Sequence, residues 1–223
     1  MIPLRDSLPS RSVPTITILI IIVNVLVFLF EISLEPYSRN HFVEQYGMVP
    51  RSFQPSSLVT SMFLHGGFMH LIGNMWFLWI YGDNVEDILG RGRYLIFYLA
   101  SGLAAGLVHL TFNANSPVPT VGASGAIAGV MGGYMLKFPH SRIVTLIPII
   151  VFFTTVEIPA WLILIYWFVI QLFSGVGELS SASNVNQGGV AWFAHIGGFL
   201  AGMALIKVLK THERYRFRDE LHW

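Results

Sequence analysis

A serine and a histidine lie far apart in this sequence, each within a strongly apolar segment. Ser124 stands in Gly-Ala-Ser-Gly at 122–125, where one apolar segment begins, and His195 stands in Ala-His-Ile-Gly-Gly at 194–198 inside another. A serine hydroxyl becomes a nucleophile when a base accepts its proton, and histidine is such a base near neutral pH. Polar groups within a membrane are costly and indicate function by default. The two residues together predict a Ser–His dyad for acyl transfer.

Acyl transfer also requires hydrogen-bond donors for the developing oxyanion, and three groups could supply them. His70 and Asn74 are four residues apart and would share one face of a helix. The backbone N–H of Ser124 would be unpaired at a helix start, and Gly122 would let the backbone approach a substrate closely. We therefore predict His70, Asn74 and Gly122 as substrate-binding or oxyanion residues.

Each of these residues also has a structural interpretation. A serine at a helix start is commonly an N-cap, and a histidine or asparagine in a span commonly ties helices together. His65 and His70 are five residues apart, which is wrong for one helix face, and no carboxylate joins them, so no metal site is predicted. No carboxylate is expected near His195 either. The imidazole should be oriented by packing or by a neutral hydrogen bond, and His109 should be interfacial.

The composition is that of a membrane protein. Of 223 residues, 54% are hydrophobic and 11% are charged, against about 25% in soluble domains. The net charge of +1 and the lack of a basic block argue against a nucleic-acid partner. There is no cysteine, which excludes disulfides, thiolate metal sites and a cysteine nucleophile, and no phosphate-binding loop is present. We expect neither a metal nor another cofactor.

Six apolar segments are candidate membrane spans, although several are shorter than the ~20 residues of a simple span. They are residues 15–32, 69–82, 94–112, 124–137, 159–173 and 191–208. The first lacks a cleavage site and should be retained. The apolar stretch 143–156 contains Pro148, so we predict a membrane-dipping or interfacial connection there. The expected fold is an all-α polytopic bundle of six transmembrane helices at 15–208, with tails at 1–14 and 209–223.

Charge predicts the orientation of this bundle. With six spans, both termini share one side, and all but two of the 13 Lys and Arg residues fall there. Only Arg39 and Arg51 fall on the other side. By the positive-inside rule the side of the termini is cytoplasmic. Ser124, His195 and the His70–Asn74 pair then lie at similar depth near the outer side.

Glycines spaced four residues apart could bring the two reactive segments together. Residues 125, 129 and 133 form one such series, and 198 and 202 form another. Stripes of small residues let helices approach closely in lipid. Contact between the fourth and sixth spans would place Ser124 near His195. Gly102 and Gly106 have the same spacing, and for them we expect packing alone.

The chain resembles the rhomboid family of intramembrane serine proteases in three segments and in their order. These are His-Gly-Gly-Phe-Met-His-Leu-Ile-Gly-Asn at 65–74, Gly-Ala-Ser-Gly-Ala at 122–126, and Ala-His-Ile-Gly-Gly at 194–198. The resemblance implies a six-helix bundle with a cavity open to the outside. It implies Ser124 as nucleophile, His195 as base, and an oxyanion hole of His70, Asn74 and the Ser124 amide.

The resemblance also implies a first outer loop, about residues 34–68, lying partly in the bilayer, and a lateral gate at the fifth span. Trp161, Trp167 and Phe168 are gate candidates, or simply lipid-facing aromatics. Two features depart from the family pattern. Ala128 stands where some members carry a tyrosine that packs on the catalytic histidine. Some members also carry a Trp-Arg pair in the first loop, and here only Arg51 stands in a comparable region.

These features predict a serine endopeptidase that cleaves transmembrane or juxtamembrane bonds of single-span membrane proteins, which would enter between helices. The expected location is a bacterial plasma membrane, with both termini cytoplasmic and the site open to the outer side. One alternative is a non-catalytic rhomboid-like protein that binds and escorts transmembrane segments. Another is a solute or metal transporter, which the lack of inverted repeats and of in-span carboxylates disfavours.

Overall fold

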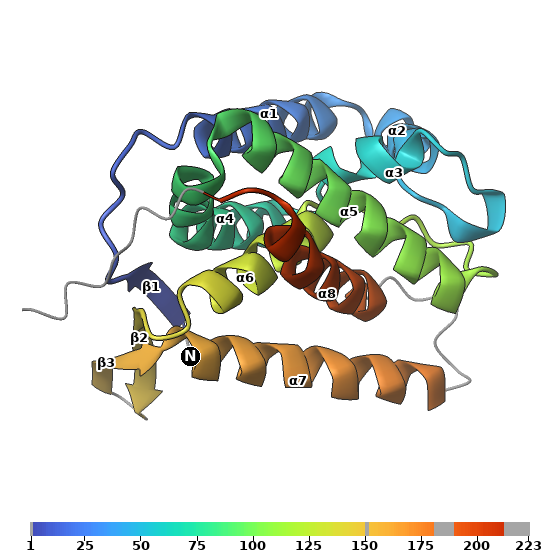
Figure 1. Ribbon diagram of the computed structural model, residues 1–223. Helices are drawn as coiled ribbons and strands as arrows, with labels where there is room; N and C mark the ends of the chain where they lie inside the picture. The colour runs from blue at the N-terminus through green and yellow to red at the C-terminus, as the bar shows by residue number, and fades with distance from the viewer. Residues whose placement is uncertain (1, 150–151, 181–189, 212–223) are drawn as a thin grey trace, which may run out of the picture.

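The computed structural model describes residues 2–149, 152–180 and 190–211, and it is mainly helical (Figure 1). The six longest apolar helices are α1 (Thr15–Ser33), α4 (Phe68–Leu89), α5 (Arg91–Asn113), α6 (Ser124–Lys137), α7 (Ala160–Ser180) and α8 (Trp192–Val208). They coincide with the six predicted segments to within a few residues, except that α4 and α7 extend seven residues further. The predicted tail at 209–223 lies outside the described residues from 212 onward.

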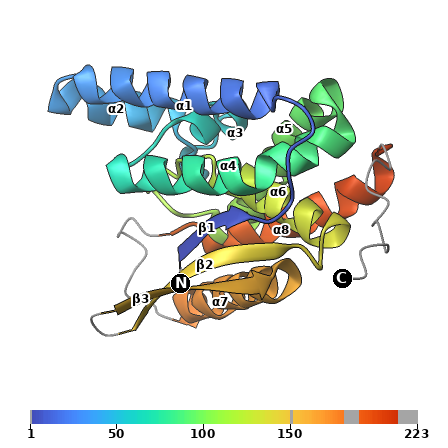
Figure 2. The ribbon, with the colours of Figure 1, turned by 90° about the vertical axis from the view of Figure 1, so that its left-hand side faces the viewer.

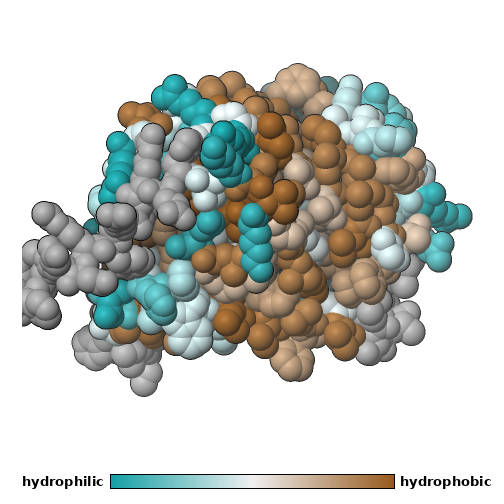
Figure 3. All heavy atoms as spheres, in the orientation of Figure 1, coloured by the Kyte–Doolittle hydropathy of each residue, from teal (hydrophilic) through white to brown (hydrophobic). Residues whose placement is uncertain are grey.

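Three of these helices are long and apolar enough to cross a membrane by length and composition: Thr15–Ser33, Arg91–Asn113 and Ala160–Gly177. Helix α8 is apolar but shorter. Figure 3 shows a broad hydrophobic band across the face of the molecule, with hydrophilic side chains toward its two ends. Exposed apolar side chains of α1 and α7 add to the lipid-compatible surface. The chain is therefore a membrane protein built from apolar helices.

Helix α6 forms the centre of the bundle, and glycines set how closely α8 approaches it. Residues 125–134 of α6 are all buried. A Cβ at Gly198 would lie 1.9 Å from the Gly125 carbonyl oxygen, and one at Gly202 would lie 1.9 Å from that of Gly129. Only glycine permits these contacts between backbones. The predicted contact between the fourth and sixth spans is confirmed. Gly102 instead packs against Met62 of the first loop and against Ala126.

The prediction of an all-helical chain is wrong in one region, because three strands form an antiparallel sheet in the order β1-β2-β3. The strands are β1 (Ile2–Asp6), β2 (Arg142–Ile149) and β3 (Phe152–Pro159). The predicted connection at 143–156 is therefore a β-hairpin, which runs directly into α7 (Figure 2). Its many β-branched residues favour a pleated strand. Pro148 pairs only with Phe153, since β1 pairs no further along β2 than Leu146.

The segment 1–14, predicted as a tail, is fastened to the bundle by its described residues. Asp6 accepts hydrogen bonds from Asn84 Nδ2 (2.8 Å) and Tyr134 Oη (2.6 Å). Burial raises the pKa of the Asp6 carboxyl to about 7. The Glu86 carboxylate accepts the backbone N–H groups of Ile16 and Thr17, both at 2.9 Å, and so satisfies the first turn of α1.

The first loop is itself folded. It contains α2 (Pro36–Tyr46), the one-turn helices η1 (Pro50–Ser52) and η2 (Ser61–Phe63), and α3 (Ser57–Thr60). Met62 and Leu64 are buried, and Met48 pairs with Thr120 in the segment before α6. The loop therefore supports the chain that leads into Ser124.

Candidate active site

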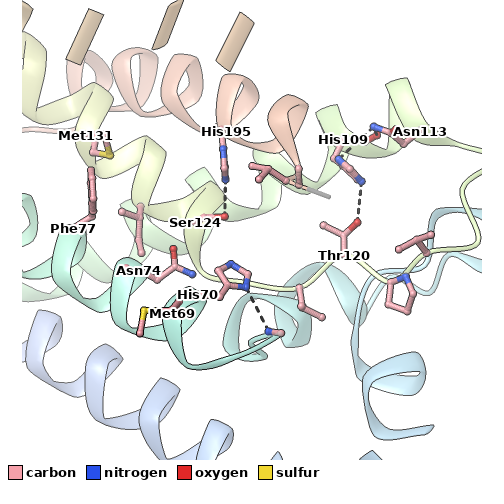
Figure 4. A pocket seen from close by; sticks show the side chains of 18 of the residues that line it. Met69, His70, Asn74, Phe77, His109, Asn113, Thr120, Ser124, Met131 and His195 are labelled. Carbon is pink, nitrogen blue, oxygen red and sulfur yellow. Dashed lines mark hydrogen bonds between the residues drawn. The ribbon is translucent and has the colours of Figure 1, made fainter. Parts of the chain in front are cut away.

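A cavity of about 770 Å³ lies among α4, α5, α6, α7 and α8 (Figure 4). Four of the five predicted site residues line it: His70, Asn74, Ser124 and His195. The segment 116–121 forms another part of its wall. The cavity is large enough for a short stretch of polypeptide.

Ser124 and His195 meet directly in this cavity. Ser124 Oγ lies 2.8 Å from His195 Nε2, although 71 residues separate them in the sequence. Ser124 is the first residue of α6, and His195 lies in the first turn of α8, so the glycine contact between these helices brings the two together. His195 is 9% exposed. This distance is that of a nucleophile and its general base.

His70 and Asn74 project from α4 toward the same part of the cavity (Figure 4). The backbone N–H of Gly66 donates to His70 Nδ1 at 3.4 Å, which leaves the proton of a neutral His70 ring on Nε2. Asn74 Nδ2 lies 2.9 Å from His65 Nε2, and burial lowers the pKa of His65 to about 4. A neutral His65 accepts one N–H of Asn74 at Nε2, and Asn74 keeps a second N–H.

Gly122 lies against both of these side chains. Its φ of +126° is in the region that L side chains rarely adopt. A Cβ at this position would lie 2.7 Å from His70 Nε2 and 3.5 Å from Asn74 Nδ2. Its backbone N–H donates to the Ser61 carbonyl at 2.9 Å. The structure thus brings all five predicted residues into one site.

Three side chains beside His195 were not predicted to contact it. Gln171 Oε1 of α7 lies 2.8 Å from His195 Nδ1, so the expected neutral hydrogen bond is present, with an amide as partner. The ring of Trp167 lies 5.7 Å from the imidazole, and that of Trp192 lies 6.4 Å away at an interplanar angle of 88°. The two tryptophan rings therefore lie beside His195, where Ala128 supplies no aromatic ring. The sequence holds no spacing signal that links 171 to 195.

One neighbouring prediction needs correction. His109 was expected to be interfacial, but it is 8% exposed, lines the cavity and pairs with Thr120 Oγ1 at 2.9 Å. Glu31, in the last turn of α1, is buried and accepts the backbone N–H of His65 at 3.2 Å. Of the three gate candidates, Trp167 lines the cavity. Trp161 is 41% exposed and Phe168 stacks on Phe199.

No metal cluster of three or more His, Asp or Glu side chains occurs among the described residues. The groups that line it are a serine hydroxyl, imidazoles, amides and apolar side chains. Such a set suits nucleophilic attack on a carbonyl, with the resulting charge held by N–H donors.

Comparison with known proteins identifies relatives of this chain. Rhomboid protein 1, mitochondrial, of Saccharomyces cerevisiae is 27% identical over 192 residues, which are 82% of this chain and 51% of that protein. Rhomboid protease GluP of Bacillus subtilis is 35% identical over 127 residues, 55% of this chain and 24% of that protein. RHOMBOID-like protein 5 of Arabidopsis thaliana is 31% identical over 160 residues, 72% of this chain and 46% of that protein.

The chain thus spans about half or less of the length of these relatives. They include yeast and plant proteins as well as a bacterial one, so they do not support the bacterial plasma membrane expected from the sequence. The family model named Rhomboid domain matches residues 52–212, which contain every predicted site residue. Because this match covers well over half of its length, the chain belongs to the rhomboid family.

Proposed function

We propose that this protein is an intramembrane serine endopeptidase in which Ser124 is the nucleophile and His195 the general base. The observation that carries the proposal is the 2.8 Å contact between Ser124 Oγ and His195 Nε2 at the wall of the cavity. Membership in a family whose relatives include a rhomboid protease supports it. The presence of both residues also favours it over a rhomboid-like protein that only binds and escorts transmembrane segments.

The reaction proceeds in two stages. Ser124 Oγ attacks the carbonyl carbon of the scissile bond while His195 Nε2 accepts the hydroxyl proton, and the imidazolium then protonates the leaving amine nitrogen. Water next attacks the acyl-enzyme and gives a proton to His195, and the Ser124 hydroxyl is restored as the carboxyl product leaves. Through both stages the N–H donors of His70, Asn74 and the start of α6 stabilise the oxyanion.

The proposed substrates are single-span membrane proteins cut within or beside their transmembrane segment. The exposed apolar surface of α7 and the hydrophobic band of Figure 3 support a site that is reached from lipid. A transmembrane helix hides its backbone carbonyls in hydrogen bonds, so the substrate must unwind near the cut. We place all six long helices across the bilayer, with the termini on the cytoplasmic side as the distribution of basic residues predicts.

A reversible cross-link tests whether such substrates require α7 to move. A Cβ at Gly175 of α7 would lie 3.4 Å from the Cβ of Trp192 of α8, close to the ~3.8 Å mean of a disulfide. The chain has no cysteine of its own, so a Gly175→Cys, Trp192→Cys pair is the sole thiol pair. With the disulfide closed, we expect cleavage of a single-span reporter in proteoliposomes to fall at least ~10-fold, because α7 can no longer open.

Labelling of Ser124 by a small fluorophosphonate should stay the same in the closed and reduced forms, since such a probe does not need the helix to move. The Gly175→Cys single variant, treated with the same oxidant, is the control. Equal cleavage of the reporter with the disulfide open and closed would contradict access of the substrate past α7. Because Trp192→Cys also removes a ring beside His195, cleavage absent from both forms counts against the protease itself only if the folded wild type and the Gly175→Cys variant fail to cleave as well.

A further inference from the structure

The side chain of Gln171 is placed unlike those of its neighbours on α7. Ile170, Leu172 and Phe173 are between 39% and 76% exposed, whereas Gln171 is 4% exposed. A buried amide is costly unless it is hydrogen-bonded, and more so next to lipid. Gln171 has partners at both ends: its Oε1 lies 2.8 Å from His195 Nδ1, and its Nε2 donates to the Trp167 carbonyl at 3.2 Å.

These two contacts define which ring nitrogen of His195 carries the proton. An amide oxygen can only accept, so His195 Nδ1 must be the protonated nitrogen. Nε2 is then free to accept the proton of Ser124 Oγ, 2.8 Å away. The opposite tautomer would place a proton between Nε2 and the hydroxyl and would remove the base from the serine.

The Trp167 carbonyl in turn defines how the amide is oriented. If the amide were rotated by half a turn, Oε1 would face the Trp167 carbonyl oxygen and two acceptors would meet. The orientation with Oε1 toward His195 is therefore the one that satisfies both ends. The ring of Trp167, 5.7 Å from the imidazole, packs beside the same hydrogen bond.

We propose that Gln171 is a positioning residue which holds His195 in the reactive tautomer, and that it makes this tautomer depend on where α7 lies. The proposal rests on the proposed protease function and extends it to a residue outside the Ser–His pair. Gln171 and His195 lie on different helices, and α7 lies along one side of the bundle, packed against α8, α6 and the hairpin (Figure 1). Displacement of α7 from α8 takes the acceptor away from Nδ1.

Gln171→Met tests the proposal, because methionine has a similar shape but its thioether sulfur is only a weak hydrogen-bond acceptor for His195 Nδ1–H. We expect kcat for a single-span reporter to fall about 100-fold with KM little changed, since the wrong histidine tautomer lowers turnover in the serine-protease template. Labelling of Ser124 by a fluorophosphonate should slow by a similar factor. Gln171→Glu keeps an acceptor oxygen toward Nδ1, and its protonated form also has an O–H that can donate to the Trp167 carbonyl, so it should restore most of the rate. Gln45→Met, the same change at an exposed position of α2, is the matched control.

A second readout does not depend on activity. Nitrogen chemical shifts of ¹⁵N-histidine-labelled protein, with His195 assigned by difference from a His195→Gln variant, should show Nδ1 protonated in the wild type and the tautomer changed in Gln171→Met. An unprotonated Nδ1 in the wild type, or an unchanged tautomer and labelling rate in Gln171→Met, would overturn the proposal. The expected shifts together with an inert Ser124 in the wild type would instead refute the protease function while leaving the positioning role intact.

Discussion

Ser124→Ala and His195→Ala are each expected to abolish cleavage of a single-span reporter, with losses of about 10⁴-fold or more. The serine supplies the atom that bonds to the carbonyl carbon, and the histidine accepts its proton at 2.8 Å. Residues that act as one unit lose nearly all activity when either is removed. Initial rates in proteoliposomes, compared at equal amounts of folded protein, measure the loss.

Two matched controls separate this effect from a general loss of protein. Ser33→Ala and His41→Ala make the same changes at exposed positions outside the cavity and should keep wild-type rates. Asn74→Ala should lower the cleavage rate by about 10–1000-fold, a smaller loss than that of the two dyad variants, because His70 and the start of α6 still supply oxyanion donors. A His195→Ala variant that cleaves at the wild-type rate would remove the general base from the mechanism.

Gly122→Ala is expected to reduce cleavage about 100-fold or more although no reacting group is removed. The added methyl would lie 2.7 Å from His70 Nε2, and the residue would have to keep a φ of +126° or rearrange. Either outcome displaces oxyanion donors that contribute about two to three powers of ten each. The rate with the single-span reporter, measured together with the melting temperature, checks the prediction.

Gly66→Ala is the control for this change. A Cβ at Gly66 would meet only His70 Nδ1, at an ordinary 3.9 Å, so the variant tests a second glycine beside the same histidine without a clash. It should cleave at close to the wild-type rate. If Gly122→Ala were as active as Gly66→Ala, the backbone at 122 would not shape the oxyanion site.

The helices and the Ser124–His195 contact could be predicted because hydropathy and glycine spacing are local signals with a clear physical meaning. Apolar segments define helices in a membrane, and the glycines at 125, 129, 198 and 202 let α6 and α8 approach closely. That approach alone brings two residues 71 positions apart within hydrogen-bond distance.

Other features had no such signal. The hairpin at 142–159 is as apolar as a membrane segment, and its pairing with β1 is a contact between residues more than 130 positions apart. Short apolar runs do not distinguish a strand from a helix by periodicity. The contact of Gln171 with His195 depends on how α7 is rotated, which an almost uniformly apolar helix does not reveal. The burial of His109 likewise follows from its pairing with Thr120 in the segment before α6.

The most direct test of the central claim is mass labelling of the protein in liposomes with a fluorophosphonate, comparing the wild type with Ser124→Ala and His195→Ala. We predict a single adduct that maps to Ser124 in the wild type and is absent from both variants, because only an activated serine reacts. A folded wild-type protein that forms no adduct, with a probe shown to reach the cavity, would contradict the account and favour a rhomboid-like protein that binds transmembrane segments without cleaving them.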